Sequence, residues 1–333
     1  MPVPVSQMWT VASYLVKQKL AGRKRYPFVL MLEPLFRCNL ACAGCGKIQY
    51  PAHILKQELS PEECFKAVEE CGTPMVSIPG GEPLMHSQID KIVEGLVARK
   101  KYIYLCTNGM FIKKRLGEFK PDKRFYFNVH LDGMEKNHDI AVEKEGVFKL
   151  AIEGIKLAKA AGFQVCTNTT VYKETDMKEI EELFIYLETL GVDGHQIAPA
   201  YGYSAVNDRE IFLTREDIHE KFKDIDRLAK RFAIRQTPVY LEFLQGKREM
   251  PCTAWGNPTY NIKGWKGPCY LITDGHYKTF EDLMTQTPWE NYGHGNDPRC
   301  EHCMVHCGYE PSAALGINSK LADSFKMLTW ALR

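Results

Sequence analysis

Strand-like and helix-like runs alternate between residue 28 and about residue 200, and this alternation constrains the fold more than any other feature of the chain. The predicted strands are the apolar runs at 28–36, 75–79, 102–106, 125–131, 164–171 and 195–199. The predicted helices include one that begins after the capping residue Ser60 and others near 87–99, 147–161 and 176–189. An alternation of this length predicts βα units and an α/β fold with a parallel sheet.

Polar or glycine-rich motifs follow the first four predicted strands. The sequence CNLACAGC (38–45) stands after the first strand, GGEP (80–83) after the second, TNG (107–109) after the third and LDG (131–133) after the fourth. Parallel α/β folds place their active sites at the carboxyl ends of the strands. We therefore expect these motifs to converge on one site.

The first motif holds three cysteines, Cys38, Cys42 and Cys45, in the spacing CxxxCxxC. Thiolate-bound metals are normally held by four protein ligands, whereas catalytic metal sites leave one position open for a substrate or cofactor. The triplet therefore predicts an iron–sulfur cluster with one open coordination position. A zinc site with a distant fourth ligand is the alternative.

The composition limits the class of protein. With 333 residues, 45% of them hydrophobic and 25% charged, the chain suits one large globular domain with an appendage, or two domains. The net charge of +2 gives no global field, so nucleic acid is not an expected partner. We find no apolar run of the roughly 18 residues that span a membrane and no signal-peptide pattern, so we expect a cytoplasmic location. In that reducing compartment, the 12 cysteines are expected to be ligands or reactive thiols.

The cysteine loop, GGEP, TNG and LDG at successive strand ends together resemble the radical S-adenosylmethionine (radical SAM) superfamily. The resemblance implies a partial (β/α)6 TIM-like barrel with a [4Fe-4S] cluster on Cys38, Cys42 and Cys45, and S-adenosylmethionine on the open iron. It implies that the cofactor is contacted by Gly80, Gly81, Glu82, Pro83, Asn108, Asp132 and Asn168. Glycine suits a backbone that must approach a ligand closely. An external one-electron donor such as flavodoxin or ferredoxin is the expected partner.

Segments of the second half resemble the hopanoid-biosynthesis branch of this superfamily, the adenosyl hopene transferases. The similar segments are WGNPTYNIKGW (255–265), PCYLI (268–272), KTFEDLM (278–284) and CEHCMVHCGYEPSA (300–313). The resemblance implies a transferase that adds the 5′-deoxyadenosyl radical to the terminal alkene of diploptene, a triterpene, and forms adenosylhopane. One alternative is a radical SAM maturase that acts on a peptide or cofactor precursor. Another is a non-catalytic iron–sulfur or zinc protein.

An addition of this kind leaves a carbon radical that needs a hydrogen atom, and a buried thiol is a suitable donor. The sequence CTN occurs on two predicted strands, at Cys106 and at Cys166. Because side chains alternate along a strand, each cysteine shares a face with the asparagine two positions later. We expect Cys106 to be the catalytic donor, since TNG is a cofactor-side motif. A buried structural cysteine is the alternative reading.

The alternation ends after residue 205, and a cysteine-rich region follows. The predicted divisions are an N-terminal amphipathic helix at 1–27, the barrel at 28–205 and the cysteine-rich region at 206–333, with a helix at 215–232. The candidates for a second metal site are Cys269, Cys300, Cys303 and Cys307, with Cys252 as an alternative ligand. A second iron–sulfur cluster and zinc both remain open.

The N-terminal segment combines apolar and basic residues. Its apolar residues include Trp9, Tyr14, Leu15 and Val16, and its basic residues are Lys17, Lys19, Arg23, Lys24 and Arg25. This composition suits a helix that lies peripherally on the inner face of an anionic membrane. It equally suits a helix packed against the barrel, and both readings stay open.

Overall fold

The computed structural model describes residues 3–316 and 321–331, which contain one sheet of nine strands in the order β6-β5-β4-β3-β2-β1-β7-β8-β9. The strands are β1 (Val29–Glu33), β2 (Met75–Ile78), β3 (Tyr102–Thr107), β4 (Phe125–His130), β5 (Gln164–Val171), β6 (Gly194–Pro199), β7 (Thr259–Asn261), β8 (Gly264–Pro268) and β9 (Thr273–Tyr277). Neighbours from β6 to β7 run parallel, and β8 is antiparallel to both β7 and β9. The six predicted strands and the α/β fold of an unclosed, partial barrel are confirmed.

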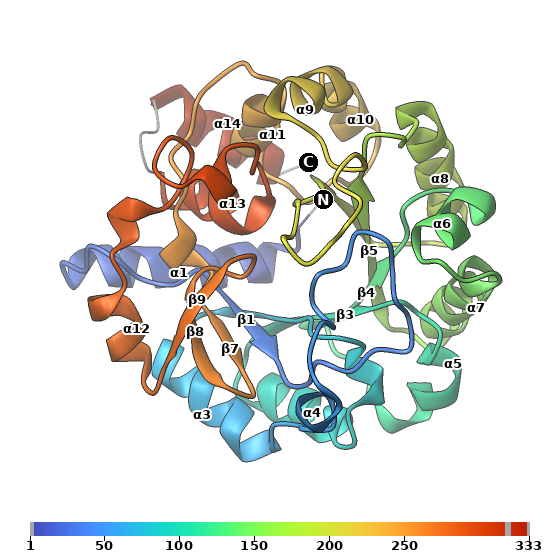
Figure 1. Cartoon of the computed structure of the whole chain (residues 1–333), viewed down its shortest axis with the longest axis horizontal. Coiled ribbons are helices and arrows are strands. Elements are labelled where there is room, and N and C mark those ends of the chain that lie inside the picture. The colour runs from blue at the N-terminus through green and yellow to red at the C-terminus, as the bar shows by residue number, and fades with distance from the viewer. Residues whose placement is uncertain (1–2, 317–320, 332–333) are drawn as a thin grey trace.

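Helices surround the outer face of this sheet (Figure 1). The α-helices are α1 (Val5–Leu20), α2 (Ala52–Leu55), α3 (Pro61–Cys71), α4 (Ile89–Ala98), α5 (Ile112–Arg115), α6 (Glu135–Ala141), α7 (Val147–Ala160), α8 (Met177–Thr189), α9 (Arg215–Lys221), α10 (Ile225–Arg231), α11 (Pro238–Leu244), α12 (Phe280–Gln286), α13 (His306–Leu315) and α14 (Leu321–Ala331). Short 3-10 helices are η1 (Pro83–Met85), η2 (Leu116–Glu118), η3 (Ala254–Gly256), η4 (Trp289–Asn291) and η5 (Pro298–Cys300). Between sheet and helices lies the core, where Leu30, Ile103 and Phe127 are fully buried.

One predicted helix is wrong in its extent. The segment 215–232 forms two helices, α9 and α10, which are separated at Phe222–Asp224. At the break, the Ile225 amide donates to the Phe222 carbonyl only three residues earlier, so the chain tightens and turns. The turn brings both Phe222 and Ile225 into the core, where each is at most 1% exposed. Core packing has therefore overridden the helical periodicity of the sequence.

The cysteine-rich C-terminal region extends the same sheet. Strand β7 pairs in parallel with β1, in register from Met31 opposite Thr259 to Glu33 opposite Asn261. Figure 1 shows the β7–β9 strands beside β1. The sheet thus continues past the boundary expected near residue 205, and the division into 28–205 and 206–333 stays a prediction.

The two ends of the barrel are covered differently. Helix α1 lies at the amino ends of the strands, where the Tyr102 hydroxyl donates to Ser6 Oγ at 2.8 Å and Gln7 Nε2 donates to the Tyr104 hydroxyl at 3.0 Å. In Figure 1, α1 passes behind the sheet, and the loops after β1 and β6 cross in front of it. The sequence motifs therefore lie at the opposite end from α1. Within the described residues, we find no helix with the length and apolar character needed to cross a bilayer.

Candidate functional site

The GGEP segment packs against the backbone that leads into the cysteine loop. The Gly81 amide donates to the Leu35 carbonyl at 3.2 Å, and the Glu82 amide donates to the Arg37 carbonyl at 2.9 Å. A Cβ on Gly81 would lie 2.0 Å from the Arg37 carbonyl oxygen. The close approach that requires glycine is therefore to the chain itself, where the sequence had suggested an approach to the cofactor. Pro83 follows as the first residue of the buried turn η1.

Glu82 connects the ends of β2 and β3. Its carboxylate is 1% exposed and accepts hydrogen bonds from the amides of Leu84 and Asn108, at 2.9 and 2.8 Å, and from Thr107 Oγ1 at 2.8 Å. Burial raises the pKa of Glu82 to about 7, against the pull of these three donors. Because its oxygens are engaged inside the protein, Glu82 positions Asn108.

Asn108 links the end of β3 to the cysteine loop. Its Nδ2 donates to Asn39 Oδ1 at 2.9 Å, and its own Oδ1 accepts from the Met110 amide at 3.1 Å. Asn39 is the residue directly after Cys38. The TNG motif and the cysteine loop are therefore adjacent, as the motif spacing led us to expect.

Asp132 and Asn168 stand at the ends of the neighbouring strands β4 and β5. Asp132 is 7% exposed, accepts from the Thr170 amide at 2.7 Å and lies 2.7 Å from His130 Nε2. Burial opposes the charged form of His130, but Asp132 outweighs it and raises the pKa of the imidazole. Asn168 is half-buried, and its carbonyl accepts from the Leu131 amide. Cofactor contact by these residues stays a prediction.

The cysteine loop presents three partly exposed thiols, at Cys38, Cys42 and Cys45. The Cys45 amide donates to the Cys42 carbonyl at 3.0 Å, and burial raises the pKa of Cys42 above its usual value. The Leu40 amide donates to Cys38 Sγ at 3.4 Å. Three soft sulfur donors and an amide donor beside them are the chemistry that suits an iron–sulfur cluster. In the described part of the chain, no group of three His, Cys, Asp or Glu already has metal-site spacing.

Cys106 lies on the inner face of β3, toward the interior of the barrel. Its Sγ is 3.4 Å from Ser77 Oγ on β2 and accepts from Asn128 Nδ2 on β4 at 3.6 Å. Asn128 Nδ2 also donates to Gln196 Oε1 at 2.8 Å, whereas Asn128 Oδ1 is buried with no partner in the described residues. Burial raises the pKa of Cys106, which keeps the thiol protonated near neutral pH. Cys166, by contrast, is fully buried with Tyr104 and Tyr126.

Sequence reasoning missed the polar neighbours of this thiol. Ser77 and Asn128 are polar interruptions in the otherwise apolar strands MVSI and FYFNVH. Inward-facing polar residues in a buried strand are a signal for a site, because a buried polar group needs a partner. The polar residues Ser77 and Asn128 within apolar strands can be read directly from the sequence.

A second missed cluster ties the C-terminal region to the cysteine loop. Lys47 Nζ lies 3.0 Å from Glu33 Oε1, donates to the Tyr270 carbonyl at 2.6 Å and stands 3.5 Å from the centre of the Tyr270 ring. Lys266 donates to the same carbonyl at 2.7 Å, and burial lowers its pKa to about 8. Burial raises the pKa of Tyr270, and the charges of Glu33, Cys106 and Cys45 raise it further. Through Lys47, two residues after Cys45, Tyr270 connects the C-terminal region to the cysteine loop.

The C-terminal cysteines gather from three separate segments of the chain. Burial raises the pKa of Cys252, and the charges of Cys303, Cys269, Cys307 and Cys300 raise it further. The Ile272 amide donates to Cys269 Sγ at 3.4 Å. A Cβ added at Gly308, the residue after Cys307, would lie 2.7 Å from Cys252 Sγ, so these two segments are adjacent. A metal site on the C-terminal cysteines stays a prediction.

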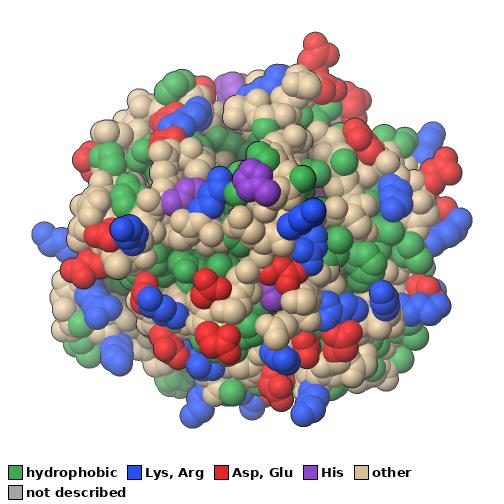
Figure 2. Space-filling model, turned by 60° about the horizontal axis from the view of Figure 1, so that its bottom comes forward, with side chains coloured by type: hydrophobic (Ala, Val, Ile, Leu, Met, Phe, Trp, Pro, Cys, Tyr) green, Lys and Arg blue, Asp and Glu red, His purple; other side chains and the backbone are tan. Residues whose placement is uncertain are grey.

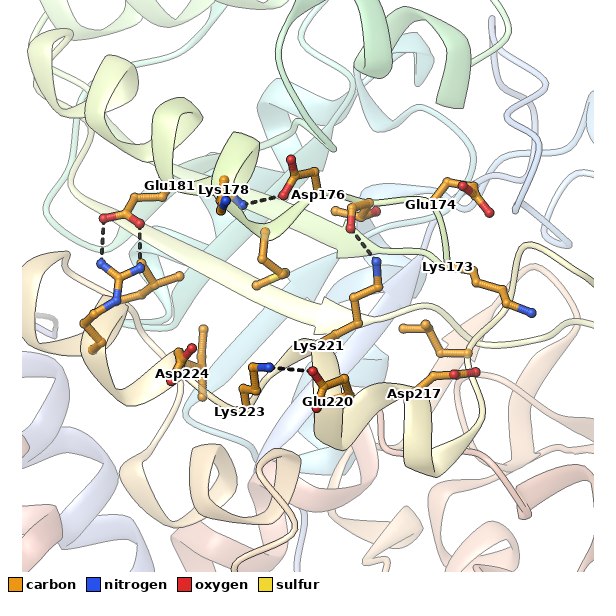
Figure 3. A pocket seen from close by; sticks show the side chains of 16 residues that line it. Lys173, Glu174, Asp176, Lys178, Glu181, Asp217, Glu220, Lys221, Lys223 and Asp224 are labelled. Carbon is orange, nitrogen blue, oxygen red and sulfur yellow. Dashed lines mark hydrogen bonds and ion pairs between the residues drawn. The ribbon is translucent and has the colours of Figure 1, made fainter.

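A surface hollow of about 710 Å³ lies elsewhere, between α8, α9 and α10. Arg227 pairs there with Glu181. Figure 3 shows the pair of Lys223 with Glu220. None of the sequence-predicted site residues lines this hollow. We therefore place the candidate site at the carboxyl ends of the strands.

Comparisons with known families divide the chain in two. Residues 32–187 match the family model of the radical SAM superfamily, and residues 195–327 match a domain of unknown function, DUF3463. The first match contains the cysteine loop and the motifs that follow β2, β3 and β4.

Curated relatives of the chain are named GTP 3′,8-cyclase. The Aquifex aeolicus protein is 34% identical over 49% of this chain and 54% of its own length, so this match spans about half of the relative. The Synechocystis protein is 25% identical over 82% of this chain and 89% of its own length.

Solved structures share the fold at low sequence identity. Streptococcus suis SuiB has a TM-score of 0.64 and 17% identity, over 92% of this chain and 77% of SuiB. The protein anSMEcpe with bound AdoMet has a TM-score of 0.63 and 17% identity, over 92% and 93% of the two chains. Both comparisons concern the fold alone.

Proposed function

We propose that the chain, whose residues 32–187 match the radical SAM family model, is a radical SAM transferase that adds the 5′-deoxyadenosyl group to the terminal alkene of diploptene, in hopanoid biosynthesis. The match to the radical SAM family model supports a [4Fe-4S] cluster and S-adenosylmethionine as its cofactors. Together they supply a 5′-deoxyadenosyl radical when bound. We propose Cys38, Cys42 and Cys45 as the cluster ligands. The C-terminal resemblance to the adenosyl hopene transferases supports the choice of substrate.

The observation that carries this proposal is the half-buried Cys106 thiol, which Ser77 and Asn128 contact on the inner face of the barrel. Addition to an alkene leaves a carbon radical on the product, and that radical needs a hydrogen atom. Ser77 and Asn128 hold the Cys106 sulfur inside the barrel, and its raised pKa preserves the S–H bond that would be donated.

Cys106 must then be returned to its thiol form. Loss of a hydrogen atom leaves a sulfur radical, which one electron and one proton restore. The external one-electron donor of the flavodoxin or ferredoxin class can supply the electron. The Ser77 hydroxyl, 3.4 Å from Cys106 Sγ, is the nearest group in the barrel that can pass a proton.

The curated relatives favour a second candidate function, which is a radical SAM enzyme that acts on a cofactor precursor such as a nucleotide. The polar interior of the barrel also favours it. Lys47 and Lys266 lie with Glu33 beside the cysteine loop, and two cations of this kind suit a substrate with phosphate or carboxylate groups. A triterpene hydrocarbon has no charged group that these two lysines could bind.

One experiment separates the two candidates. We would reconstitute the full chain without oxygen, add S-adenosylmethionine and reductant, and offer diploptene or GTP in parallel. Adenosylhopane, with the summed mass of diploptene and the adenosyl group plus one hydrogen, is the expected product. Conversion of GTP with diploptene left unchanged would replace the first candidate by the second.

The role of Cys106 needs its own variant and a matched control. Cys106→Ala should lower adenosylhopane formation on the order of a hundredfold, the scale at which a positioned transfer group contributes, while S-adenosylmethionine cleavage continues. Cys166→Ala, in the second CTN sequence, should keep product formation near that of the wild type. Equal losses in both variants would remove Cys106 from the reaction.

A further inference from the structure

Helix α1 exposes an apolar stripe on its outer side, while Gln7, Gln18 and Val11 pack on its inner side against the barrel. Gln7 and Gln18 are its two buried side chains. Trp9, Val16 and Leu20 are 72%, 56% and 84% exposed. A surface helix of a globular protein normally carries charged and polar residues on its outer side. The exposed apolar side therefore serves something other than the packing of this chain.

The exposed residues form one continuous stripe along the helix. At about 100° per residue, they fall within a sector about 100° wide, with one lysine on each flank. The stripe consists of Val5, Trp9, Ala12, Val16 and Leu20. Lys17 and Lys19 are the flanking lysines, and both are exposed. A shallow groove runs along the stripe between Trp9 and Leu20.

The charged side chains of the first 32 residues are all positive. On the face drawn in Figure 2, lysine and arginine side chains are interspersed with aspartate and glutamate. The first 32 residues, by contrast, contain no aspartate or glutamate. Their five cations are Lys17, Lys19, Arg23, Lys24 and Arg25. None of the five forms an ion pair with a carboxylate of the described residues.

We propose that α1 docks the protein onto an anionic membrane surface. The apolar stripe enters the headgroup region, and the five cations pair with anionic lipid headgroups. A second copy of the chain is the poorer occupant. A two-fold pairing through α1 would bring the five cations of one chain against the same five of the other, and like charges oppose such contact.

The docked surface is the closed end of the barrel. Since α1 covers the amino ends of the strands, the cysteine loop and Cys106 face away from the bilayer in the docked state. Membrane docking through α1 is therefore independent of which substrate the enzyme uses.

Vesicle flotation of the full chain tests the docking. We expect binding to phosphatidylcholine vesicles that contain phosphatidylglycerol, no binding to phosphatidylcholine alone, and release as salt is raised. Trp9→Ser with Leu20→Ser should abolish binding. Arg23→Gln, Lys24→Gln and Arg25→Gln together should weaken it roughly a hundredfold. These side chains are exposed, so circular dichroism should show an unchanged fold.

A matched control removes exposed apolar residues from another surface. Ile140→Ser with Leu150→Ser changes side chains that are 62% and 40% exposed, and should leave vesicle binding unchanged. Equal binding to neutral vesicles, or no binding at all, would overturn the proposal. Sedimentation that shows a dimer, lost in the Trp9→Ser and Leu20→Ser variant, would assign the stripe to a second copy instead.

Discussion

Glu82 shows how a single buried carboxylate can organise a site that it does not itself enter. Its three hydrogen-bond donors come from the turn after β2 and from the end of β3. Asn108, held in this way, reaches the cysteine loop through Asn39. The carboxylate therefore acts on the site through the position of Asn108.

The raised pKa of Glu82 predicts a particular dependence of stability on pH. The folded value of about 7 lies above the ordinary 4.5, so between these values the folded chain holds a proton that the unfolded chain has released. The free energy of unfolding should then fall as pH rises from about 5 to about 7, by at most about 1.4 kcal/mol per pH unit. Urea unfolding across this range measures the slope.

Glu82→Gln is the control for that slope. Glutamine does not titrate, so the part of the slope that belongs to Glu82 should vanish in the variant. At pH 8 the variant should be less stable than the wild type by about 1–3 kcal/mol, because an amide nitrogen then faces the Asn108 amide donor. An unchanged slope in the variant would assign the pH dependence to other groups.

At the scale of residues, the sequence predicted where the site residues lie along the strands, but it did not predict their hydrogen-bond partners. The cysteine triplet, Asn108 and Asp132 were predicted to lie at strand ends, and they do. Their contacts could not be predicted, because each comes from a residue distant in sequence, such as Asn39 for Asn108 and Thr170 for Asp132. Strand alternation fixes which way a side chain points, but the neighbouring strand decides what it meets.

At the scale of elements, the loop after β2 and the loop after β1 fit each other closely. Gly81→Ala would place a Cβ on the Arg37 carbonyl and force the two loops apart, which should cost about 1–3 kcal/mol of stability. The displaced cysteine loop should also hold less iron after reconstitution. Thermal unfolding and iron per chain measure the two effects.

Gly117→Ala is the matched control for this loop contact. Gly117 lies in η2, and nothing stands within 4 Å of an added Cβ there. Stability and iron content should stay at the wild-type level. A Gly81→Ala protein that matched this control would show that the loops can separate without loss.

The elements that the sequence predicted are those with local signals. Apolar strand runs and the Ser60 capping box of α3 are short-range patterns, and the structure confirms them. The β7–β9 strands gave no such signal, since β7 has only three residues and gains its place by pairing with β1 more than 200 residues away. The break between α9 and α10 likewise depends on the core that they cover.

At the scale of the whole molecule, two groups of cysteines stand far apart in the sequence, at 38–45 and 252–307, and metal content can distinguish their roles. If both hold a [4Fe-4S] cluster, the wild type should carry about eight iron atoms per chain, and Cys300→Ser with Cys303→Ser should reduce this to about four. The variant should still cleave S-adenosylmethionine. Iron and zinc analysis, with electron paramagnetic resonance of the reduced protein, measures this.

Cys64→Ser with Cys71→Ser is the control for metal content. Both cysteines are buried in α3 against the sheet, away from either group. This variant should keep the full metal content. If the wild type holds zinc in place of the second four iron atoms, the C-terminal cysteines form a structural zinc site. Equal metal content in the wild type and in both double variants would exclude iron and zinc from the C-terminal cysteines.

The sheet remains open, because β6 at one end and β9 at the other have no strand between them in the described residues. In a closed eight-stranded barrel, side chains from every strand fill the interior and fix its width. Here the missing wall is supplied by loops and by the C-terminal region, which anchors beside β1 through Tyr270. The loops and the C-terminal region can therefore differ among related proteins to fit substrates of different size, while the strands that position the site residues stay the same.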